Sequence, residues 1–495
     1  MQAQVVDAVG GPARARVILL FGAVLALNTA DASTVGAVAG QLEPALDIGN
    51  TEVGLLASVS LIVGAAAAIP VGMLVDRTHR VRLLAISIVL WSVATFAGGL
   101  AGTYSQLLLT RLALGAVAAT AGPAIASLTG DYFPARERVR VYGYILTGEI
   151  AGSAVGFILS GTIAGLLSWR WAFFALSIPG LWLARELWRT LPEPQRGGTS
   201  RLERGALDLV AEGAAPERGG YKANDEGAVR DDELALEAVR ARGLEPDPDL
   251  VLVADAARMP LRRAVRYVLQ IRTNVELIIS SALGYFFLAG LQTFAVVFVR
   301  GHYNISQTTA SGILGLLLIG AVVGTLISAP LTDWLLRQGL LSARIWVPAV
   351  AYMVAAVLFL IGIVNTSLTP AIWFDVGGAA ALAAANPPLD AARLDIMPPG
   401  LWGRAESVRT VVRTVGQATA PLLFGAVADL VAGIAPSQAP IGTRPGGVSA
   451  STAEGLEVSF LLMLVALAAA GYILLRARRS YPRDVATAAA SAQVA

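Results

Sequence analysis

Five ionisable side chains stand within long apolar stretches of this 495-residue chain. They are Asp31, Arg111, Glu149, Asp375 and Arg413. An ionisable group inside a lipid bilayer is costly unless it is paired or hydrated, so each is a candidate for function. A desolvated aspartate near an arginine suits reversible proton exchange. We predict Asp31 as a proton acceptor and Arg111 as its partner or as a clamp for a substrate anion; a fixed structural ion pair is the alternative.

The apolar stretches that carry these residues are long enough to cross a membrane. Hydrophobic residues make up 55% of the chain and charged residues 15%, against roughly 45–50% and about 25% in soluble domains. A membrane-spanning helix needs about 20 mainly apolar residues. The sequence predicts twelve such spans, at residues 17–40, 52–75, 83–103, 105–128, 140–164, 169–190, 275–299, 308–332, 343–364, 369–394, 405–432 and 456–477.

A polar stretch at residues 195–274 divides the twelve spans into two sets of six. The expected fold is therefore all-α and integral to a membrane. The expected organisation is a cytoplasmic N-terminal arm at 1–16, a six-helix bundle at 17–194, a cytoplasmic linker with an amphipathic segment at 195–274, a second six-helix bundle at 275–478 and a cytoplasmic tail at 479–495.

The distribution of arginine indicates the orientation of the spans. Alternate short loops hold arginines at positions 77, 80, 82, 136, 138, 140, 337, 344 and 404. The positive-inside rule places these loops and both termini in the cytoplasm. Together with the Ala- and Gly-rich composition, this predicts a multi-pass protein of the plasma (inner) membrane of a bacterium.

Composition also excludes several classes of function. The net charge of +2 gives no basic field for nucleic acid. The absence of cysteine and the presence of only two histidines exclude thiol chemistry and the usual metal sites. No nucleophile–base constellation and no phosphate-binding loop stand out. We expect no enzyme activity, cofactor or metal; the expected partners are a small-molecule or lipid-like substrate, protons and the bilayer, and we expect a monomer.

The two halves of the chain resemble each other. Residues 48–80 align without gaps to residues 305–337, and Gly122–Pro134 aligns to Asn386–Pro398. The aligned pairs are Thr51 with Thr308, Asp76 with Asp333, Arg80 with Arg337, Pro123 with Pro387, and Asp131 with Asp395. Two parallel repeats of six helices are typical of transporters whose substrate binds near the membrane midplane.

The loop after the second span carries a more specific signal. Residues 72–80, GMLVDRTHR, resemble the G-x-L-x-D-R-x-x-R signature of the major facilitator superfamily. This resemblance implies twelve helices in two pseudo-symmetric bundles. A carboxylate at a helix end can pair with arginines in one conformation and release them in another. The resulting candidates for gating are Gly72, Asp76, Arg77, Arg80, Asp333, Arg337 and, at the outer end of the tenth span, Asp375.

The first span carries a narrower resemblance. Residues 27–35, LNTADASTV, resemble the L-N-Y-x-D-R-Y-T-V pattern of spinster-type transporters, with further support from Thr110-Arg111 and Trp169-Arg170-Trp171. The resemblance covers about residues 20–194 and implies proton-driven or proton-gated export of lysophospholipids, sphingosine-type lipids and related amphiphiles. Two positions depart from the pattern: Ala32 replaces an arginine, and the Ala116–Ala119 region replaces a glutamate.

In the facilitator fold helices 1, 4, 7 and 10 line the cavity, so this resemblance implies that Asp31 and Arg111 approach each other. Glu149 and Arg413 take equivalent places in the two repeats and suit a zwitterionic headgroup or a gate, with Glu149 as a third proton-coupling candidate. Helix 11 alternatively packs its arginines on Asp390 or Asp395. The predicted substrate-binding residues are Asn28, Arg111, Glu149, Tyr285, Gln292, Arg409, Arg413 and Gln417.

Three functions fit these observations. The leading one is secondary active, proton-coupled export of lipid-like or other amphipathic small molecules by alternating access. The second is uptake of an organic anion or another polar nutrient through Arg111. The third is a non-transporting sensor or assembly partner that uses the long linker. Glycines at 148, 152, 156 and 161 predict close helix packing rather than a site.

Overall fold

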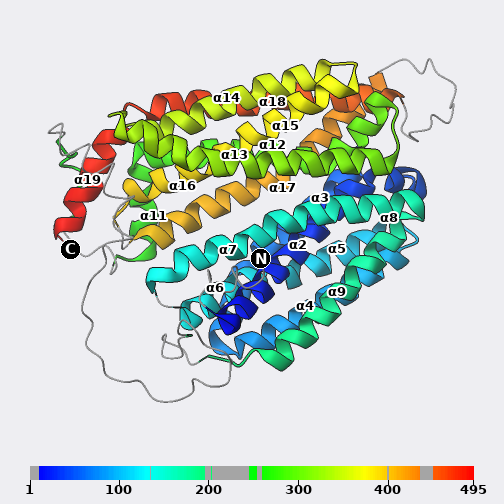
Figure 1. Ribbon diagram of the computed structural model, residues 1–495, viewed down its shortest axis with the longest axis horizontal. Coiled ribbons are helices and arrows are strands. Elements are labelled where there is room, and N and C mark those ends of the chain that lie inside the picture. The colour runs from blue at the N-terminus through cyan, green and yellow to red at the C-terminus, as the bar shows by residue number, and fades with distance from the viewer. Residues whose placement is uncertain are drawn as a thin grey trace. The chain divides into compact units, whose positions relative to one another are not determined.

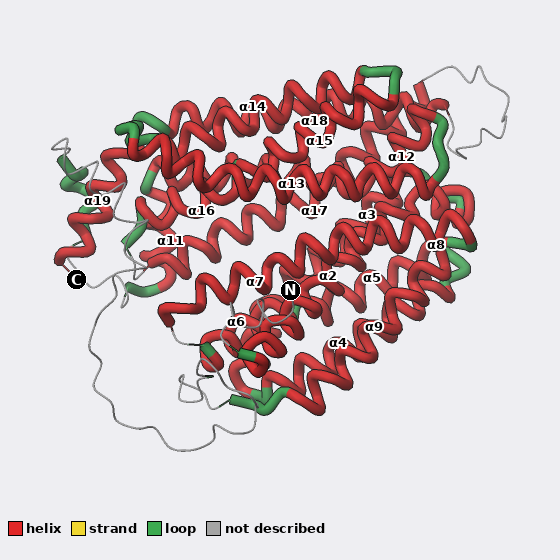
Figure 2. The backbone as a smooth tube through the Cα atoms, in the orientation of Figure 1, coloured by secondary structure: helices red, strands yellow, loops and turns green. Residues whose placement is uncertain are grey.

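The computed structural model describes residues 11–133, 135–194, 202, 245–252, 259–398, 401–434 and 450–494. Throughout these residues the chain forms helices joined by short loops and no strand (Figure 2). Most of the predicted linker at 195–274 lies outside the described residues. The chain divides into two compact units. Unit 1 comprises Met1–Ala223, Thr293–Gly315 and Gly442–Val448, and unit 2 comprises Asn224–Gln292, Leu316–Ile441 and Ser449–Ala495.

The first six predicted spans are all helical in unit 1. In chain order they are α2 (Pro12–Leu46), α3 (Asn50–Arg77), α4 (Arg80–Leu100), α5 (Tyr104–Ala118), α6 (Ala121–Tyr132), α7 (Ala135–Val155), η1 (Gly156–Ser160), α8 (Gly161–Leu166) and α9 (Trp169–Thr190). Helix α4 runs beside α9, and α2 runs beside α7 (Figure 1). Helix α9 also packs on α2, and α5 packs on α4, so α2, α4 and α5 are close enough to share the candidate site.

The second half of the chain repeats this order of helices. The helices are α11 (Leu261–Gln270), α12 (Arg272–Tyr303), α13 (Gln307–Arg337), α14 (Ala343–Val364), α15 (Leu368–Ala384), α16 (Asn386–Asp395), α17 (Trp402–Ile434), α18 (Ala450–Ala477) and α19 (Tyr481–Val494). In unit 2, α14 packs beside α18 and α15, and α17 packs beside α18 (Figure 1). Helices α11 and α19 flank the spans and are too short to cross a bilayer.

Eleven helical stretches of the described residues are long and apolar enough to cross a membrane. The sixth predicted span, α9, is not among them. It carries four charged residues, Arg170, Arg185, Glu186 and Arg189. It has 22 residues and packs along α4 within unit 1. The all-α, twelve-helix fold predicted from the sequence is confirmed.

Two predicted spans are divided into two helices each. The span predicted at 105–128 is interrupted between α5 and α6, and the span predicted at 369–394 is interrupted between α15 and α16. A proline follows each interruption closely, as Pro123 and Pro387. Proline lacks a backbone N–H, and its ring clashes with the carbonyl four residues earlier, so a continuous helix is disfavoured there. The interruptions therefore belong to the internal repeat.

The glycine spacing on α7 brings this helix into close contact with α2. A methyl group at Gly148, Gly152 or Gly156 would collide with the backbone of α2. The Thr29 hydroxyl donates a hydrogen bond to the backbone carbonyl of Glu149 at 2.8 Å. The predicted packing role of these glycines is confirmed.

Candidate functional site

Asp31 on α2 and Arg111 on α5 form an ion pair in the interior of unit 1. The distance from Arg111 Nη1 to Asp31 Oδ2 is 2.9 Å, and the residues are 1% and 2% exposed, respectively. The Thr95 hydroxyl on α4 donates a 3.4 Å hydrogen bond to Asp31 Oδ1. Three helices thus supply one polar cluster. The predicted proximity of Asp31 and Arg111 is present, and their role in coupling stays a prediction.

Arg111 uses only part of its hydrogen-bonding capacity on Asp31. Its Nε and Nη2 atoms have no hydrogen-bond partner among the described residues. The guanidinium lies over the ring of Phe173, with 4.9 Å between Arg111 Cζ and the ring centroid. The guanidinium can therefore donate hydrogen bonds to a second anion or to water while it stays paired with Asp31.

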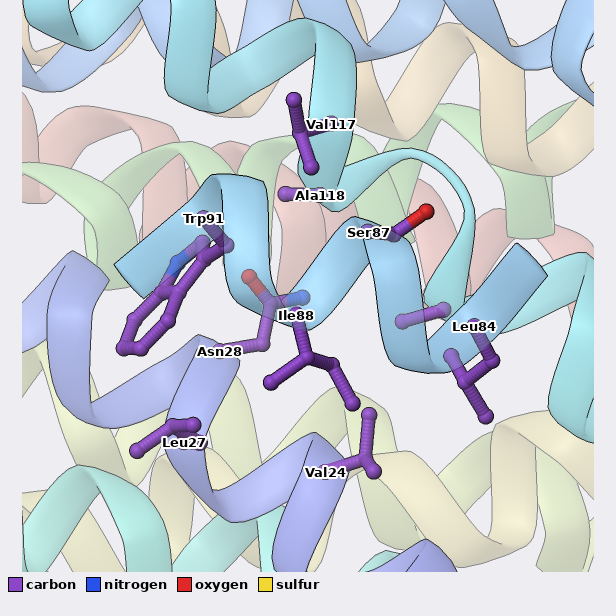
Figure 3. A pocket seen from close by; sticks show the side chains of 10 residues that line it. Val24, Leu27, Asn28, Leu84, Ser87, Ile88, Trp91, Val117 and Ala118 are labelled. Atoms are coloured by element: carbon purple, nitrogen blue, oxygen red, sulfur yellow. The ribbon is translucent and has the colours of Figure 1, made fainter. Parts of the chain in front are cut away.

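Asn28 precedes Asp31 by one helical turn on α2. It lines a pocket between α2, α4 and the junction of α5 with α6 (Figure 3). Arg111 does not line this pocket. Of the substrate-binding residues predicted in the first half, Arg111 therefore belongs to the ion pair and Asn28 to a neighbouring cavity.

Unit 2 holds a second polar cluster, formed by α16 and α17. Arg409 lies 3.1 Å from Asp390 and 2.9 Å from Glu406. Arg393 also pairs with both carboxylates, at 3.3 Å from Asp390. Of the two packing partners predicted for helix 11, Asp390 is confirmed, whereas Asp395 pairs with Arg344.

Arg413 extends this cluster by one turn of α17. Its guanidinium lies 4.8 Å from the ring centroid of Tyr285 on α12. Its Nε has no hydrogen-bond partner among the described residues. Arg393 and Arg409 balance the two carboxylates, and Arg413 adds a further positive charge beside them. The cluster thus suits an acidic or zwitterionic group on a substrate.

The other predicted substrate and coupling residues have simpler surroundings. Gln292 on α12 and Gln417 on α17 are half-buried. Glu149 has an exposed side chain on α7 in unit 1, whereas its repeat equivalent Arg413 lies in unit 2. Asp375 on α15 lies directly against Gly362 of α14.

Arg80, a predicted gating residue, is the centre of a charge cluster at the start of α4. It pairs with Asp131 of α6 and lies 2.8 Å from Glu193, beyond α9. Its Nη2 also donates to the carbonyl of Pro194 at 2.8 Å. Glu193 was not predicted from the sequence, although its place at residues 191–194, directly after a span, marks it as a helix-end residue. The cluster ties three helices together.

The structure corrects the repeat partner of Arg80. The gapless alignment pairs Arg80 with Arg337, yet Arg344 takes the equivalent position. Arg344 pairs with Asp395 as Arg80 pairs with Asp131, and each arginine precedes its aspartate by 51 residues. The register shifts by seven residues for three reasons. In the aligned register α13 extends three residues farther than α3, and the connection to α14 is three residues longer than that to α4. In addition, Arg80 is the first residue of α4, whereas Arg344 is the second residue of α14.

The remaining gating candidates are less informative. The side chains of Gly72, Asp76 and Arg77 lie outside the described residues. Asp333 is half-buried and Arg337 is exposed at the end of α13. In unit 2 the Tyr481 hydroxyl donates to Asp395, so the tail helix α19 contacts the pair of Arg344 and Asp395.

Comparisons with known proteins agree with this architecture. The sequence profile described as Major Facilitator Superfamily matches residues 20–421. A probable L-galactonate transporter of Escherichia coli (strain K12) is 27% identical over 170 residues, or 34% of this chain and 37% of that protein. Protein spinster of Drosophila melanogaster is 28% identical over 181 residues, or 36% of this chain and 30% of that protein. The matches span only about a third of each relative.

A crystal structure with the same fold covers nearly the whole chain. It is a bacterial homologue of the human lysosomal transporter spinster, in an inward-facing and occupied conformation. The TM-score is 0.72 at 20% sequence identity, covering 96% of this chain and 98% of the other. At this identity the likeness establishes the shared fold.

Proposed function

This chain belongs to the major facilitator superfamily, and we propose that it exports lipid-like or other amphipathic small molecules in exchange for protons. It is a secondary transporter and a multi-pass membrane protein. We place it as a monomer in the inner membrane of a bacterium, with the arginine-rich loops and both termini in the cytoplasm. The domain boundaries given above, including a cytoplasmic linker at 195–274, belong to this proposal.

The buried pair of Asp31 and Arg111 is the observation that carries the proposal. Removing one partner of a buried ion pair leaves an uncompensated charge, which costs about 3–5 kcal/mol. Protonation of Asp31 therefore changes the energy of unit 1 by an amount large enough to favour a different conformation. Thr95 lies on a third helix, α4, and hydrogen-bonds to Asp31. Protonation of Asp31 therefore alters contacts of α2, α4 and α5 together.

The charge of the solute determines the direction of coupling. A neutral or zwitterionic solute needs no free arginine, so it is compatible with deprotonated Asp31 paired to Arg111. The proton then binds in the return step, which gives exchange and hence export. The similarity to spinster and the apolar cavity beside Asn28 support a solute of this amphipathic kind.

A second candidate is uptake of an organic anion together with a proton. An anion can bind the unpaired Nε and Nη2 of Arg111 beside Asp31, and protonation of Asp31 removes the repulsion between the two negative charges. The unsatisfied Nε and Nη2 of Arg111 and the excess arginine near Arg413 favour this candidate. The similarity to the probable L-galactonate transporter also supports it.

Proteoliposomes with a trapped pH indicator separate the two candidates. The purified protein is challenged in turn with an outward gradient of a zwitterionic lysophospholipid, a cationic drug and a polar organic acid. Export by exchange predicts proton entry into the vesicle as the lysophospholipid or drug leaves. Proton exit that accompanies only the organic acid would instead establish anion symport, and proton-independent efflux of every solute would refute both.

A further inference from the structure

Helix α11 is a short amphipathic helix directly before the first span of unit 2. Only Ile271 separates it from α12, which begins at Arg272 and is long and apolar enough to cross a membrane. On one face Ala264, Tyr267 and Val268 are buried, and α11 packs beside α17. The helix is therefore held at the boundary where α12 enters the bilayer, with its opposite face open.

The open face of α11 carries three arginines. Arg262, Arg266 and Leu269 recur at the four- and three-residue spacing of one helix face, and Arg263 borders them. All four side chains are exposed, and the three arginines have no ion pair among the described residues. Arginine stems and a leucine can contact hydrocarbon while the guanidinium groups reach polar headgroups, so this pattern suits a helix at a lipid–water boundary.

A second group of arginines lies at the same end of unit 2, around the end of α18. The Thr273 hydroxyl, at the start of α12, shares a 2.6 Å hydrogen bond with the Ser480 hydroxyl. The Ser342 hydroxyl, directly before α14, donates to the backbone carbonyl of Arg478 at 3.1 Å. Helices α11 and α19 also lie at this end (Figure 1). The exposed arginines of this second group, which likewise have no ion pair among the described residues, are Arg476, Arg478 and Arg479.

The neighbouring carboxylates offset only part of this positive charge. Glu276 pairs with Arg272 at 3.3 Å, and Asp247 lies 3.6 Å from Arg483, so these two carboxylates already have partners. The exposed carboxylates of the segment that docks on α19 are Glu245 and Asp249. An excess of positive charge therefore remains at this end of unit 2.

The position of these charges favours phospholipid over a soluble anion. Arg476 lies in the last turn of α18, and α11 ends one residue before the first turn of α12. At both places the chain passes the level of the phospholipid headgroups. An anionic leaflet attracts each arginine near its surface strongly enough for roughly a five-fold gain in affinity. Several arginines together would thus select anionic lipid.

We propose that these arginines form a basic surface that binds the headgroups of anionic phospholipids. The basic surface consists of Arg262, Arg263, Arg266, Arg476, Arg478 and Arg479. It belongs to unit 2, whereas the ion pair of Asp31 and Arg111 belongs to unit 1. The inference therefore stands whether the transported solute is an amphiphile or an organic anion. Bound headgroups would hold α11 at the membrane surface, and with it the start of α12.

Native mass spectrometry of the purified full chain measures this binding without a transport assay. The protein is titrated with phosphatidylglycerol, which is anionic, or with phosphatidylcholine that carries the same acyl chains. We expect phosphatidylglycerol to bind at least roughly ten-fold more tightly, because only its headgroup has a net charge. Equal affinity for the two lipids would overturn the proposal.

A triple variant removes the charge of the α11 face, and a matched triple variant controls for net charge. The α11 variant combines Arg262→Gln, Arg263→Gln and Arg266→Gln. The control removes exposed arginines at the start of α4 and the end of α9 in unit 1, as Arg82→Gln, Arg185→Gln and Arg189→Gln. The α11 variant should lose roughly ten-fold in affinity for phosphatidylglycerol and none for phosphatidylcholine, whereas the control should keep the wild-type preference. Equal losses in both would show an effect of net charge alone and reject the basic surface.

Two further arms separate a lipid site from its alternatives. Lysine keeps the charge at the three α11 positions, so a variant with Arg262→Lys, Arg263→Lys and Arg266→Lys should retain most of the affinity. A loss as large as that of the glutamine variant would assign the arginines a structural role instead. Soluble glycerol phosphate carries the headgroup phosphate without acyl chains and should not displace phosphatidylglycerol. Displacement at comparable concentrations would assign the arginines to a soluble anion and contradict the lipid surface.

Discussion

The guanidinium of Arg111 and the carboxylate of Asp31 lie 2.9 Å apart and are almost completely removed from solvent. This pair joins α2 to α5 across the interior of unit 1. Since two buried charges are tolerable together and costly apart, we propose that the protonation of Asp31 is coupled to the conformation of the helices that hold the pair.

The interaction between these two side chains should dominate the stability of unit 1. Asp31→Asn leaves Arg111 charged and buried, so we expect the free energy of unfolding to fall by about 3–5 kcal/mol. Arg111→Gln should cost a similar amount. The double variant should be more stable than either single one, as a thermal unfolding cycle in detergent can measure. Strictly additive losses would show that the pair is not a coupled unit.

Loss of Arg80 should affect stability and transport more strongly than loss of one of its acidic partners. Glu193→Gln leaves the pairing of Arg80 with Asp131, whereas Arg80→Gln removes every charged interaction of the cluster. We expect Arg80→Gln to lower the unfolding temperature and the transport rate more than Glu193→Gln does. Arg82→Gln on the exposed face of α4 is the control. Equal effects of Arg80→Gln and Arg82→Gln would contradict a role for the cluster.

Docking of the tail helix α19 should weaken as the pH rises. Burial raises the pKa of Asp484 above its ordinary value of 3.8, although the Thr273 N–H donates to its carboxylate at 3.2 Å and opposes this rise. Because the docked pKa exceeds the undocked one, the contribution of Asp484 is full below its ordinary pKa. That contribution is lost as the pH passes through the raised pKa.

Hydrogen exchange at residues 481–494, corrected for the intrinsic pH dependence of exchange, measures this effect. Protection should decline with rising pH in the wild type and in the exposed control Asp249→Asn, but not in Asp484→Asn. A decline of equal size in Asp484→Asn would assign the effect to another group.

The close contact of α7 with α2 predicts that two Gly→Ala substitutions change the free energy of unfolding in opposite directions. Replacing a helical glycine by alanine ordinarily stabilises a helix by roughly 0.8–1 kcal/mol. Gly152→Ala should instead destabilise, because the added methyl group meets the backbone of Ala26. Gly312→Ala has open space around its added methyl group and should stabilise. Thermal unfolding of both variants measures the difference, and the same sign for both would contradict the close packing.

Much of this architecture follows from the sequence because a bilayer imposes strict rules. Long apolar stretches locate the helices, and isolated charges within them draw attention to Asp31 and Arg111. The helix interruptions were also foreseeable, since Pro123 and Pro387 align in the repeats. The first and last residues of each helix were harder to predict. The helices continue past the apolar stretches into polar residues at the membrane–water interface, so hydropathy does not mark where they end.

Partners that come from other helices were harder to predict. Glu193 and Glu406 lie at or near helix ends, where a charged residue is usually solvated, so only the three-dimensional structure shows that they face Arg80 and Arg393. Tyr481 was similarly hidden in the tail. The pocket beside Asn28 is lined mainly by aliphatic side chains rather than by a motif, so the sequence contains no direct signal for it.

The most direct test of the account is proton movement in proteoliposomes that contain Asp31→Asn. An outward gradient of lysophosphatidylcholine is imposed across vesicles with a trapped pH indicator, and Asp249→Asn serves as the control for loss of an exposed carboxylate. We predict that the wild type and Asp249→Asn take up protons as the lysolipid leaves, and that Asp31→Asn does not. Undiminished proton uptake in correctly folded Asp31→Asn would contradict the assignment of Asp31 as the coupling residue.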